Sequence, residues 1–227
     1  MRVDQLSLIK SGLFYALKSI VLSLAIFAAQ FVFCADVAWE KVKDGDGITV
    51  YSRPVSGARF SEFKTETIFE ANLQQCAGLF MSVPNMPKWM YNAKKVELES
   101  ATSELDRKLY MALHLPFPLH DRDAHVKSWL MQNEDKSVVY TMELIPTEEK
   151  SDGYVHLKTL HVRIILTPIS PQQTKVVYVA LIDPGGNIPS WANYLFSDAP
   201  YESLKNARKI VSETKNNLVV ASIKNGF

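Results

Sequence analysis

The chain has 227 residues, of which 47% are hydrophobic and 22% charged, with a formal net charge of +1. This composition is ordinary for a folded domain and unlike that of disordered chains, which combine low hydrophobicity with high charge. Because positive and negative residues are interspersed and nearly balanced, the chain lacks the broad basic surface that binds phosphates, and we expect no nucleic-acid partner.

The N-terminus has the pattern of an export signal. Basic residues precede an uncharged, apolar run from Ile20 to Cys34, as they do in signal peptides. This run of roughly 15 residues is short for a membrane-spanning helix, which needs about 20. Extending it back to Gly12 leaves an uncleaved anchor open.

Cleavage is expected after Cys34, because Val32 and Cys34 are small enough for the positions that signal peptidase reads. Residues 1–34 are therefore predicted to be a signal peptide and residues 35–227 a single domain, periplasmic or secreted. A lipoprotein acylated at Cys34 is the less favoured alternative, since bulky Phe33 precedes it.

Two strands are predicted at the start of the domain. The segment Lys43–Gly47 has the composition of a turn, and Ile48–Tyr51 alternates as a short strand does. A second strand is predicted over residues 59–69, where charged residues alternate with Phe and Thr. This alternation indicates one wet face and one packed face.

Two short helices are predicted next. Apolar residues recur at helical spacing over residues 72–82, with Asn72 as the N-cap. Pro84 and Pro87 then mark a turn into a short helix over residues 88–91. Cys76 lies on the apolar side of the first helix, and because no activating base is near it in the pattern, we interpret it as a core residue.

The segment from residue 93 to residue 183 alternates with period two, which predicts an antiparallel sheet. Leu105–Leu115 and Thr159–Thr167 are apolar on one side only, as half-buried strands are. Val176–Ile182 is apolar on both sides. We therefore expect this last strand to be central and covered on each face.

A turn at Asp183–Asn187 leads to a predicted short helix over residues 188–196 and then to a long amphipathic helix. Ser197 or Asp198 is the expected cap of the long helix, with Pro200 in its first turn. Its apolar residues, from Tyr201 onward to Leu218, fall on one side, so the helix is expected to cover the sheet.

This order of elements resembles that of the START (StAR-related lipid transfer) domain and its helix-grip superfamily. The segments that carry the resemblance are Trp39-Glu40 with Asp46–Arg53, Pro116-Phe117-Pro118 before Asp121-Arg122-Asp123, and Asp183–Asn193. The resemblance implies an α+β fold in which a curved antiparallel sheet wraps around a long C-terminal helix, with two short helices after the second strand. It also implies a cavity for an apolar small molecule, such as a sterol, phospholipid or fatty acid, and no catalysis.

The residues expected to line this cavity are aromatic or long apolar side chains: Trp89, Phe117, Trp129, Met142, Tyr178, Ile188, Trp191 and Phe196. Each of them also fits ordinary core packing. Arg163 interrupts an apolar strand and Asp183 ends another, so they are a candidate pair for the polar group of a ligand. An outward-facing arginine and a turn-capping aspartate are the alternative, and Arg122 and Asp123 are expected to fix a loop.

No catalytic residue, metal ligand or cofactor is predicted. His120 and His125 are five residues apart, as are His156 and His161, and residues at that spacing on a strand point to opposite faces. No third ligand stands at a recognisable spacing. The common hydrolase, nucleotide-binding and zinc-protease motifs are also absent from the sequence.

Three functions therefore remain open. The first is an exported, monomeric lipid carrier with transient membrane contact, gated by the Gly185-Gly186 turn and residues 188–196. The second is a cavity enzyme, a cyclase or hydrolase on the same scaffold, for which His114 and His161 are the residues to test. The third is a membrane-anchored interaction module with a filled core, which requires that the N-terminal segment stay attached.

Overall fold

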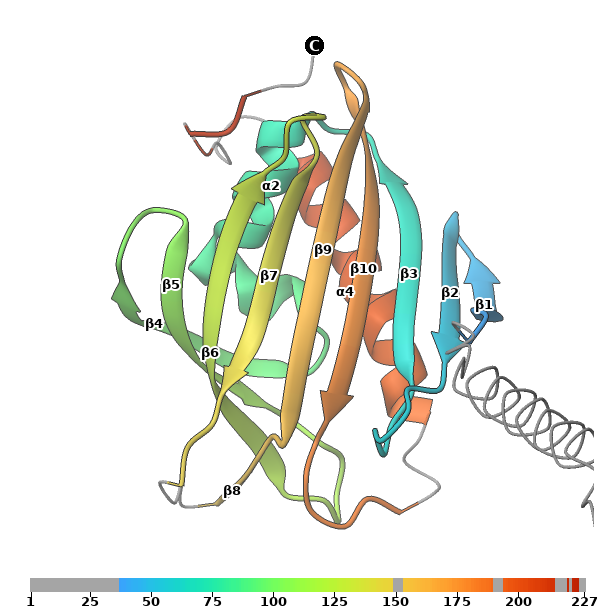
Figure 1. Ribbon diagram of the computed structural model, residues 1–227, viewed down its shortest axis with the longest axis vertical. Helices are drawn as coiled ribbons and strands as arrows, with labels where there is room; N and C mark the ends of the chain where they lie inside the picture. The colour runs from blue at the N-terminus through green and yellow to red at the C-terminus, as the bar shows by residue number, and fades with distance from the viewer. Residues whose placement is uncertain (1–36, 149–152, 190–193, 215–219, 221, 225–227) are drawn as a thin grey trace, which may run out of the picture. The chain divides into compact units, whose positions relative to one another are not determined.

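The computed structural model describes residues 37–148, 153–189, 194–214, 220 and 222–224, so the predicted signal peptide lies outside the described residues. One sheet dominates the fold (Figure 1), with the strand order β1-β2-β3-β10-β9-β7-β6-β5-β4 and β8 paired to β6. The strands are β1 (Glu40–Gly45), β2 (Ile48–Arg53), β3 (Glu62–Phe69), β4 (Ala93–Ala101), β5 (Asp106–Leu113), β6 (Asp121–Gln132), β7 (Val138–Ile145), β8 (Tyr154–His156), β9 (Thr159–Ser170) and β10 (Gln173–Asp183). Only the pairing of β6 with β8 is parallel among those described.

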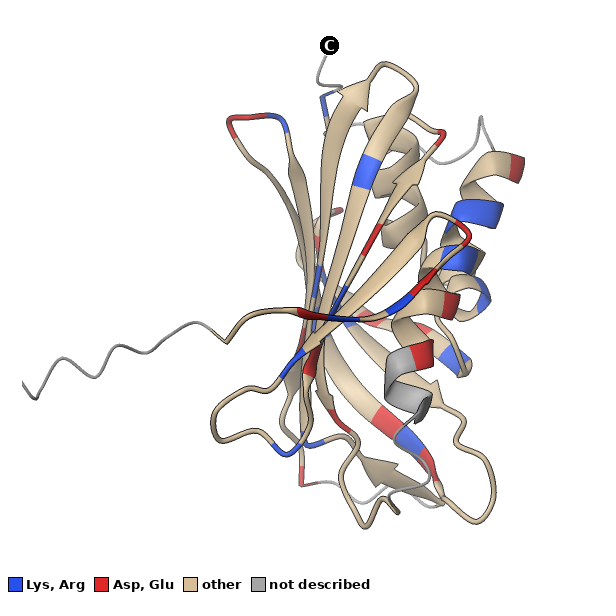
Figure 2. Ribbon diagram, turned by 90° about the vertical axis from the view of Figure 1, so that its right-hand side faces the viewer, with Lys and Arg blue, Asp and Glu red and all other residues tan. Residues whose placement is uncertain are grey.

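The helices lie on one face of this sheet, which we call the inner face (Figure 2). They are α2 (Leu73–Met81), the short 3₁₀ helix η1 (Val83–Asn85), α3 (Met86–Trp89) and α4 (Tyr194–Glu213). The predicted N-cap is confirmed, because the Asn72 side chain accepts from the Gln75 amide at 2.9 Å. The Gln75 side chain in turn accepts from the Asn72 amide at 3.0 Å, which completes a capping box. Among the described helices, none is long and apolar enough to cross a membrane.

The hydrophobic core fills the space between the inner face and the helices. Ile164 on β9 lies between Tyr140 on β7 and Tyr178 on β10, and all three side chains are buried. Cys76 is buried in α2, and burial raises the pKa of its thiol to about 12. Its interpretation as an unreactive core residue is confirmed.

Helix α4 is tied to the first hairpin by polar contacts. The Asp46 carboxylate, in the β1–β2 turn, accepts from the Tyr201 hydroxyl at 3.0 Å and from the Lys205 ammonium at 2.8 Å. Lys43 forms an ion pair with Asp198 at 2.7 Å. These contacts connect β1 and β2 to the helix that covers the inner face.

Several element boundaries differ from the prediction; the strand predicted over residues 59–69, for example, begins at Glu62. A strand, β1, precedes the two predicted strands and runs to Gly45, so only Asp46 and Gly47 form the turn, both at positive φ. Helix α3 begins at Met86, because Pro87 fits the first turn of a helix, where its missing N–H is not needed. Helix α4 begins at Tyr194, before the expected caps, and Pro200 lies inside it.

The predicted short helix over residues 188–196 lies partly outside the described residues. Ile188 and Pro189 are not helical, residues 190–193 are not described, and residues 194–196 belong to α4. Leu218, expected on the apolar side of the last helix, lies outside the described residues.

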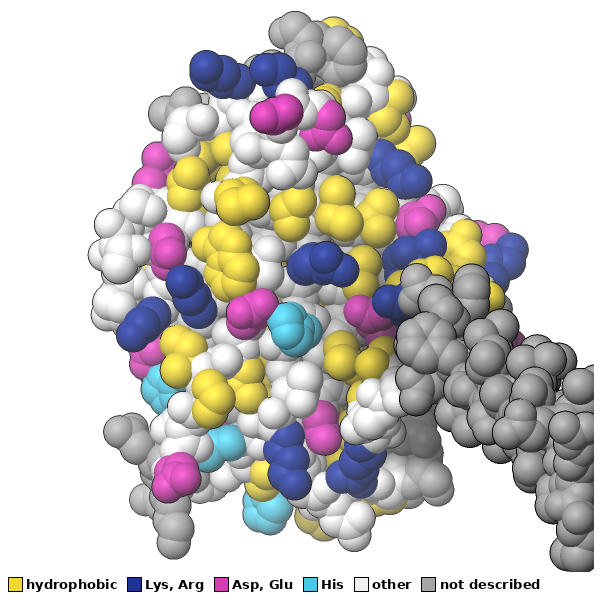
Figure 3. All heavy atoms as spheres, viewed as in Figure 1, with side chains coloured by type: hydrophobic (Ala, Val, Ile, Leu, Met, Phe, Trp, Pro, Cys, Tyr) yellow, Lys and Arg dark blue, Asp and Glu magenta, His cyan; other side chains and the backbone are white. Residues whose placement is uncertain are grey.

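Strand β10 is central, between β3 and β9, as predicted. However, no described element covers the outer face of the sheet at this strand (Figure 3). Hydrophobic side chains instead form a row across that face, where Met131, Val139, Ile165 and Val177 are neighbours in register. The expectation that β10 is covered on both faces is therefore wrong.

Candidate functional site

A small pocket lies between the inner face and the N-terminal half of α4. Its volume is about 40 Å³. The lining residues come from the start of β3, the end of β10 and α4: Phe60, Ser61, Phe63, Tyr178, Ala180, Ile182, Ala199 and Pro200. Of these residues, Tyr178 alone has an ionisable side chain. The pocket therefore suits an apolar ligand.

Three loops meet at this end of the molecule. Phe60 precedes β3, Leu115 and Leu119 belong to the β5–β6 loop, and Ile188 follows β10. These four side chains form a separate hydrophobic cluster, in which Leu115 and Ile188 are buried. The cluster joins segments that are far apart in the sequence, and it lies where the pocket meets the loops.

Arginines hold the segment Pro184–Gly186, which we call the gate turn. Arg122, buried in β6, donates to the carbonyls of Pro184 at 2.6 Å and Gly185 at 3.3 Å, and also to the carbonyl of His120. Arg59 donates to the Gly186 carbonyl at 2.7 Å. The prediction that Arg122 fixes a loop is thus confirmed, and the loop is the one before α4.

The two glycines of the gate turn are required by conformation. Gly185 has φ +66° and Gly186 has φ +62°, in the region that glycine favours. A Cβ at Gly185 would also lie only 2.6 Å from the backbone carbonyl of His156. The turn therefore packs tightly against the segment between β8 and β9.

Several polar side chains of the inner face and α3 are buried with few hydrogen-bond partners. The hydroxyl of Thr65 and the indole N–H of Trp89 have no hydrogen-bond partner in the part of the chain that the structure describes, and the hydroxyls of Ser128 and Tyr140 have none beyond each other. Burial raises the pKa of Tyr140 to about 12 and also raises that of Tyr178. Such groups are rare in native cores, and each one is a place where a bound polar atom would be stabilised.

Four of the predicted site residues lie on the inner side. Tyr178 lines the pocket, and Ile188 belongs to the loop cluster beside it. Trp89 and Met142 are buried in the main core, where the Trp89 ring meets the Phe80 ring edge-on at 5.2 Å. That they contact a ligand stays a prediction.

Phe117, Trp129 and Arg163 do not line the pocket. Phe117 is 94% exposed at the tip of the β5–β6 loop. Trp129 lies on the outer face of β6 under Lys127, whose ammonium is 5.4 Å from the ring. Arg163 is exposed on the outer face of β9, because it alternates with the buried Val162 and Ile164.

The candidate pair of Arg163 and Asp183 is therefore wrong, and the alternative holds. The Asp183 carboxylate accepts from the Gly185 amide at 2.8 Å and caps the gate turn. Trp191 and the side chain of Phe196 lie outside the described part of the structure.

The residues that sequence reasoning missed are Arg59, Phe60, Ala180 and Pro200. The first two were included in the strand predicted over residues 59–69, whereas in the structure they precede β3, and neither Ala180 nor Pro200 stands out by chemistry. The alternation of Tyr178, Ala180 and Ile182 along β10 was the one pattern that could have indicated the pocket lining, because residues two apart on a strand point to the same face.

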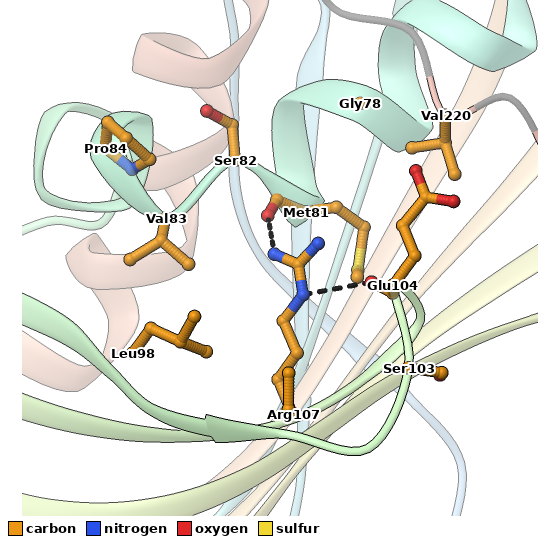
Figure 4. A pocket seen from close by; sticks show the side chains of 11 residues that line it. Gly78, Met81, Ser82, Val83, Pro84, Leu98, Ser103, Glu104, Arg107 and Val220 are labelled. Atoms are coloured by element: carbon orange, nitrogen blue, oxygen red, sulfur yellow. Dashed lines mark hydrogen bonds between the residues drawn. The ribbon is translucent and has the colours of Figure 1, made fainter.

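Two further hollows lie away from this site. A groove of about 620 Å³ lies between α2, η1 and the β4–β5 hairpin (Figure 4). In it, Arg107 donates to the carbonyls of Met81 at 2.7 Å and Glu104 at 2.9 Å. Arg107 thereby caps the C-terminal end of α2. A hollow of about 340 Å³ on the outer face is lined by Glu143, His161 and Arg163 among others.

Three of the histidines lie within hydrogen-bond distance of carboxylates. His156 contacts the buried Asp123 at 2.6 Å, which joins β8 to β6. His125 contacts Glu99 at 2.7 Å and His114 contacts Asp121 at 2.9 Å. Within the described ranges, no three His, Cys, Asp or Glu side chains are grouped to hold a metal ion.

A curved antiparallel sheet with helices on one face, closed at one end by loops, defines a helix-grip domain. The family model of the START domain matches residues 34–208. The protein therefore belongs to the START family, and its predicted fold class is confirmed.

The similar proteins come from bacteria and mammals. An uncharacterized protein of Pseudomonas aeruginosa is 29% identical over 196 residues, covering 85% of this chain and 95% of the relative. The crystal structure of a STAR-related lipid transfer protein from Xanthomonas axonopodis matches with a TM-score of 0.70 and 27% identity, covering 77% of this chain and 98% of that one. The rat phosphatidylcholine transfer protein is 21% identical over 159 residues, covering 67% of this chain and 73% of the relative.

Proposed function

We propose that this protein is a monomeric carrier that binds a lipid between the inner face and α4 and exchanges it with membranes. The observation that carries the proposal is the apolar pocket beside Tyr178, which shares Phe60 with a cluster of loop residues from three parts of the chain. Because its volume of about 40 Å³ is far below the roughly 300–1,000 Å³ of ligand pockets, α4 and the loops must move apart to admit a lipid. The similarity to proteins named for lipid transfer supports the same function.

The lining of the pocket favours binding over catalysis. Among the described residues, its lining contains no histidine, carboxylate, lysine or cysteine, and these are the groups that usually act as general acids, bases or nucleophiles. Burying a charged group without a partner is costly. The buried part of the ligand is therefore apolar, with at most a neutral oxygen within reach of the Tyr178 hydroxyl, while a charged head group would stay at the loops.

Membrane contact is proposed at the loop end. Phe117 is 94% exposed and stands between Leu115 and Leu119, which belong to the loop cluster. An exposed aromatic ring on a loop that closes a lipid site is well suited to enter the interface of a bilayer. We further propose export to the periplasm or the medium, which rests on the signal-like pattern of residues 1–34.

Tyr178→Phe tests the site with a minimal change. The substitution removes one buried hydroxyl to which no described residue hydrogen-bonds, so the fold is expected to keep its stability. Affinity for a lipid with an oxygen at that position is expected to fall by about 1 kcal/mol, the usual contribution of one hydrogen bond. Binding is measured by titration with fluorescent sterol, phosphatidylcholine and fatty acid probes.

Ala180→Phe complements this test by filling the pocket. All probes are expected to lose binding, while Arg163→Gln on the outer face serves as the matched control and keeps it. Undiminished binding by a folded Ala180→Phe protein would place the ligand elsewhere.

A further inference from the structure

The gate turn is held by two arginines that differ in exposure. Arg122 is 2% exposed, and the carbonyls of Pro184 and Gly185 that it binds are buried with it. Arg59 and Gly186 are both exposed, and the hydrogen bond of 2.7 Å between them lies at the surface. Arg122 is thus a fixed anchor of the turn, whereas the bond to Arg59 is open to exchange.

Breaking the Arg59 bond leaves no buried polar group without a partner. The Gly186 carbonyl is at the surface, where water can replace the guanidinium. Arg59 forms no ion pair with any carboxylate in the described structure, and its guanidinium lies 5.1 Å from the Phe60 ring. Its charge is therefore free for a stronger acceptor than a neutral carbonyl.

A phosphate group is such an acceptor. Guanidinium groups bind phosphate with two parallel hydrogen bonds, and charge-assisted bonds are roughly twice as strong as neutral ones. The surroundings point to phosphates at a membrane: the side chain of Lys158 lies beside Gly185, and Phe117 is exposed on the neighbouring loop. Cations next to an exposed aromatic ring match the surface of an anionic bilayer.

The nearby acidic groups do not oppose this contact strongly. The Asp183 carboxylate accepts a hydrogen bond from the Gly185 amide. The Asp121 carboxylate is paired with Lys94 at 2.6 Å and with His114 at 2.9 Å. Neither carboxylate is therefore available as a second acceptor for Arg59.

We propose that Arg59 is a latch on the gate turn, and that the phosphates of an anionic phospholipid surface release it. In solution Arg59 holds Gly186, and Ile188 stays packed in the loop cluster with Phe60, which lines the pocket. At an anionic membrane the guanidinium moves to lipid phosphate, and Gly186 with the residues up to Ile188 is released, while Arg122 still holds Pro184 and Gly185. This regulation rests on the proposed function, since the opened site is the one that exchanges lipid.

Amide hydrogen exchange over residues 185–188, which lie between two prolines, tests the latch without any transferred ligand. With the protein as the cell produces it, vesicles containing phosphatidylglycerol are expected to speed exchange in this segment about fivefold, the factor corresponding to one basic side chain at an anionic surface. Pure phosphatidylcholine vesicles are expected to leave it unchanged. Inorganic phosphate is expected to act far more weakly, and an equal effect would overturn the membrane as the trigger.

Arg59→Gln separates a latch from a simple membrane anchor. The variant is expected to exchange fast in this segment with no vesicles present and to gain nothing from phosphatidylglycerol. Slow exchange in the variant under all conditions, or an unchanged response to phosphatidylglycerol, would overturn the proposal. Arg163→Gln, which removes an exposed arginine from the outer face, is the control and keeps the wild-type response.

The two proposals fail in distinguishable ways. A protein that binds no lipid probe but still shows this exchange pattern would contradict the carrier function and support the latch. A protein that transfers lipid equally well with glutamine at position 59, to neutral and anionic vesicles alike and with the wild-type exchange pattern, would support the carrier and overturn the latch.

Discussion

Single residues of the gate turn determine how tightly this end is closed. Gly185→Ala is expected to destabilise the protein more than Gly186→Ala. Both positions have positive φ, which costs a non-glycine residue about 1 kcal/mol, but only a Cβ at Gly185 would meet a backbone carbonyl, at 2.6 Å. Urea unfolding of the two variants measures the difference, and equal losses would show that the turn is not packed against the β8–β9 segment.

Arg122 is the second residue whose role can be measured. Arg122→Met keeps the length and apolar stem of the side chain but leaves the buried carbonyls of Pro184 and Gly185 without a donor. A loss of about 2 kcal/mol is expected, because hydrogen bonds from a charged donor contribute about that much. The exposed Arg163→Met should change the free energy of unfolding by less than about 0.5 kcal/mol. Similar losses in both variants would contradict an anchoring role.

The sequence allowed some of these roles to be predicted and not others. Asp183 precedes Pro-Gly-Gly, a pattern that predicts a capping side chain, and the structure confirms it. Arg163 was ambiguous because one charged residue in an apolar strand points inward or outward depending on register. The register is set by β7 and β10, which lie far away in the chain.

At the scale of elements, α4 depends on the β1–β2 turn. Hydrogen bonds from Lys205 and Tyr201 lower the pKa of Asp46 below its usual value of 3.8. A carboxyl group with a lower pKa in the folded chain stabilises the fold above its unfolded pKa, and the contribution is lost as the pH falls through the folded pKa. The contacts between Asp46 and α4 are therefore expected to weaken below about pH 4.

Asp46→Asn tests this link, because asparagine tolerates the positive φ of 51° at this position. The variant is expected to unfold at a lower temperature than the wild type at pH 7, and the gap between the two melting temperatures is expected to narrow as the pH falls below about 4. Glu134→Gln, at an exposed glutamate in the β6–β7 turn, is the control and should follow the wild type. A gap that stays constant with pH would contradict the assignment.

Elements with one buried face were predicted from the sequence, and exposed ones were not. β9 alternates in burial and was recognised from Leu160 to Leu166. β1 was missed because it is an edge strand with mostly exposed side chains, so no alternation marks it. The start of α4 was predicted too late in the chain because proline is typical of the first turn of a helix. In the structure the helix begins at Tyr194 and Pro200 lies inside it.

For the whole molecule, the order of elements and three short segments predicted the helix-grip fold. They did not predict the pocket, because its lining combines a loop residue such as Phe60 with β10 and α4, and such proximity depends on tertiary packing. An apolar helix on an alternating sheet is equally compatible with a filled core. The choice between a carrier and a filled core therefore requires a measurement on the protein itself.

That measurement is mass spectrometry of the gently purified protein, first under native and then under denaturing conditions. The carrier function predicts a noncovalent adduct of lipid mass that denaturation releases. The same adduct is expected to be absent from the Ala180→Phe protein. A bare chain that also binds none of a panel of sterols, fatty acids and phospholipids would contradict the function proposed for this protein.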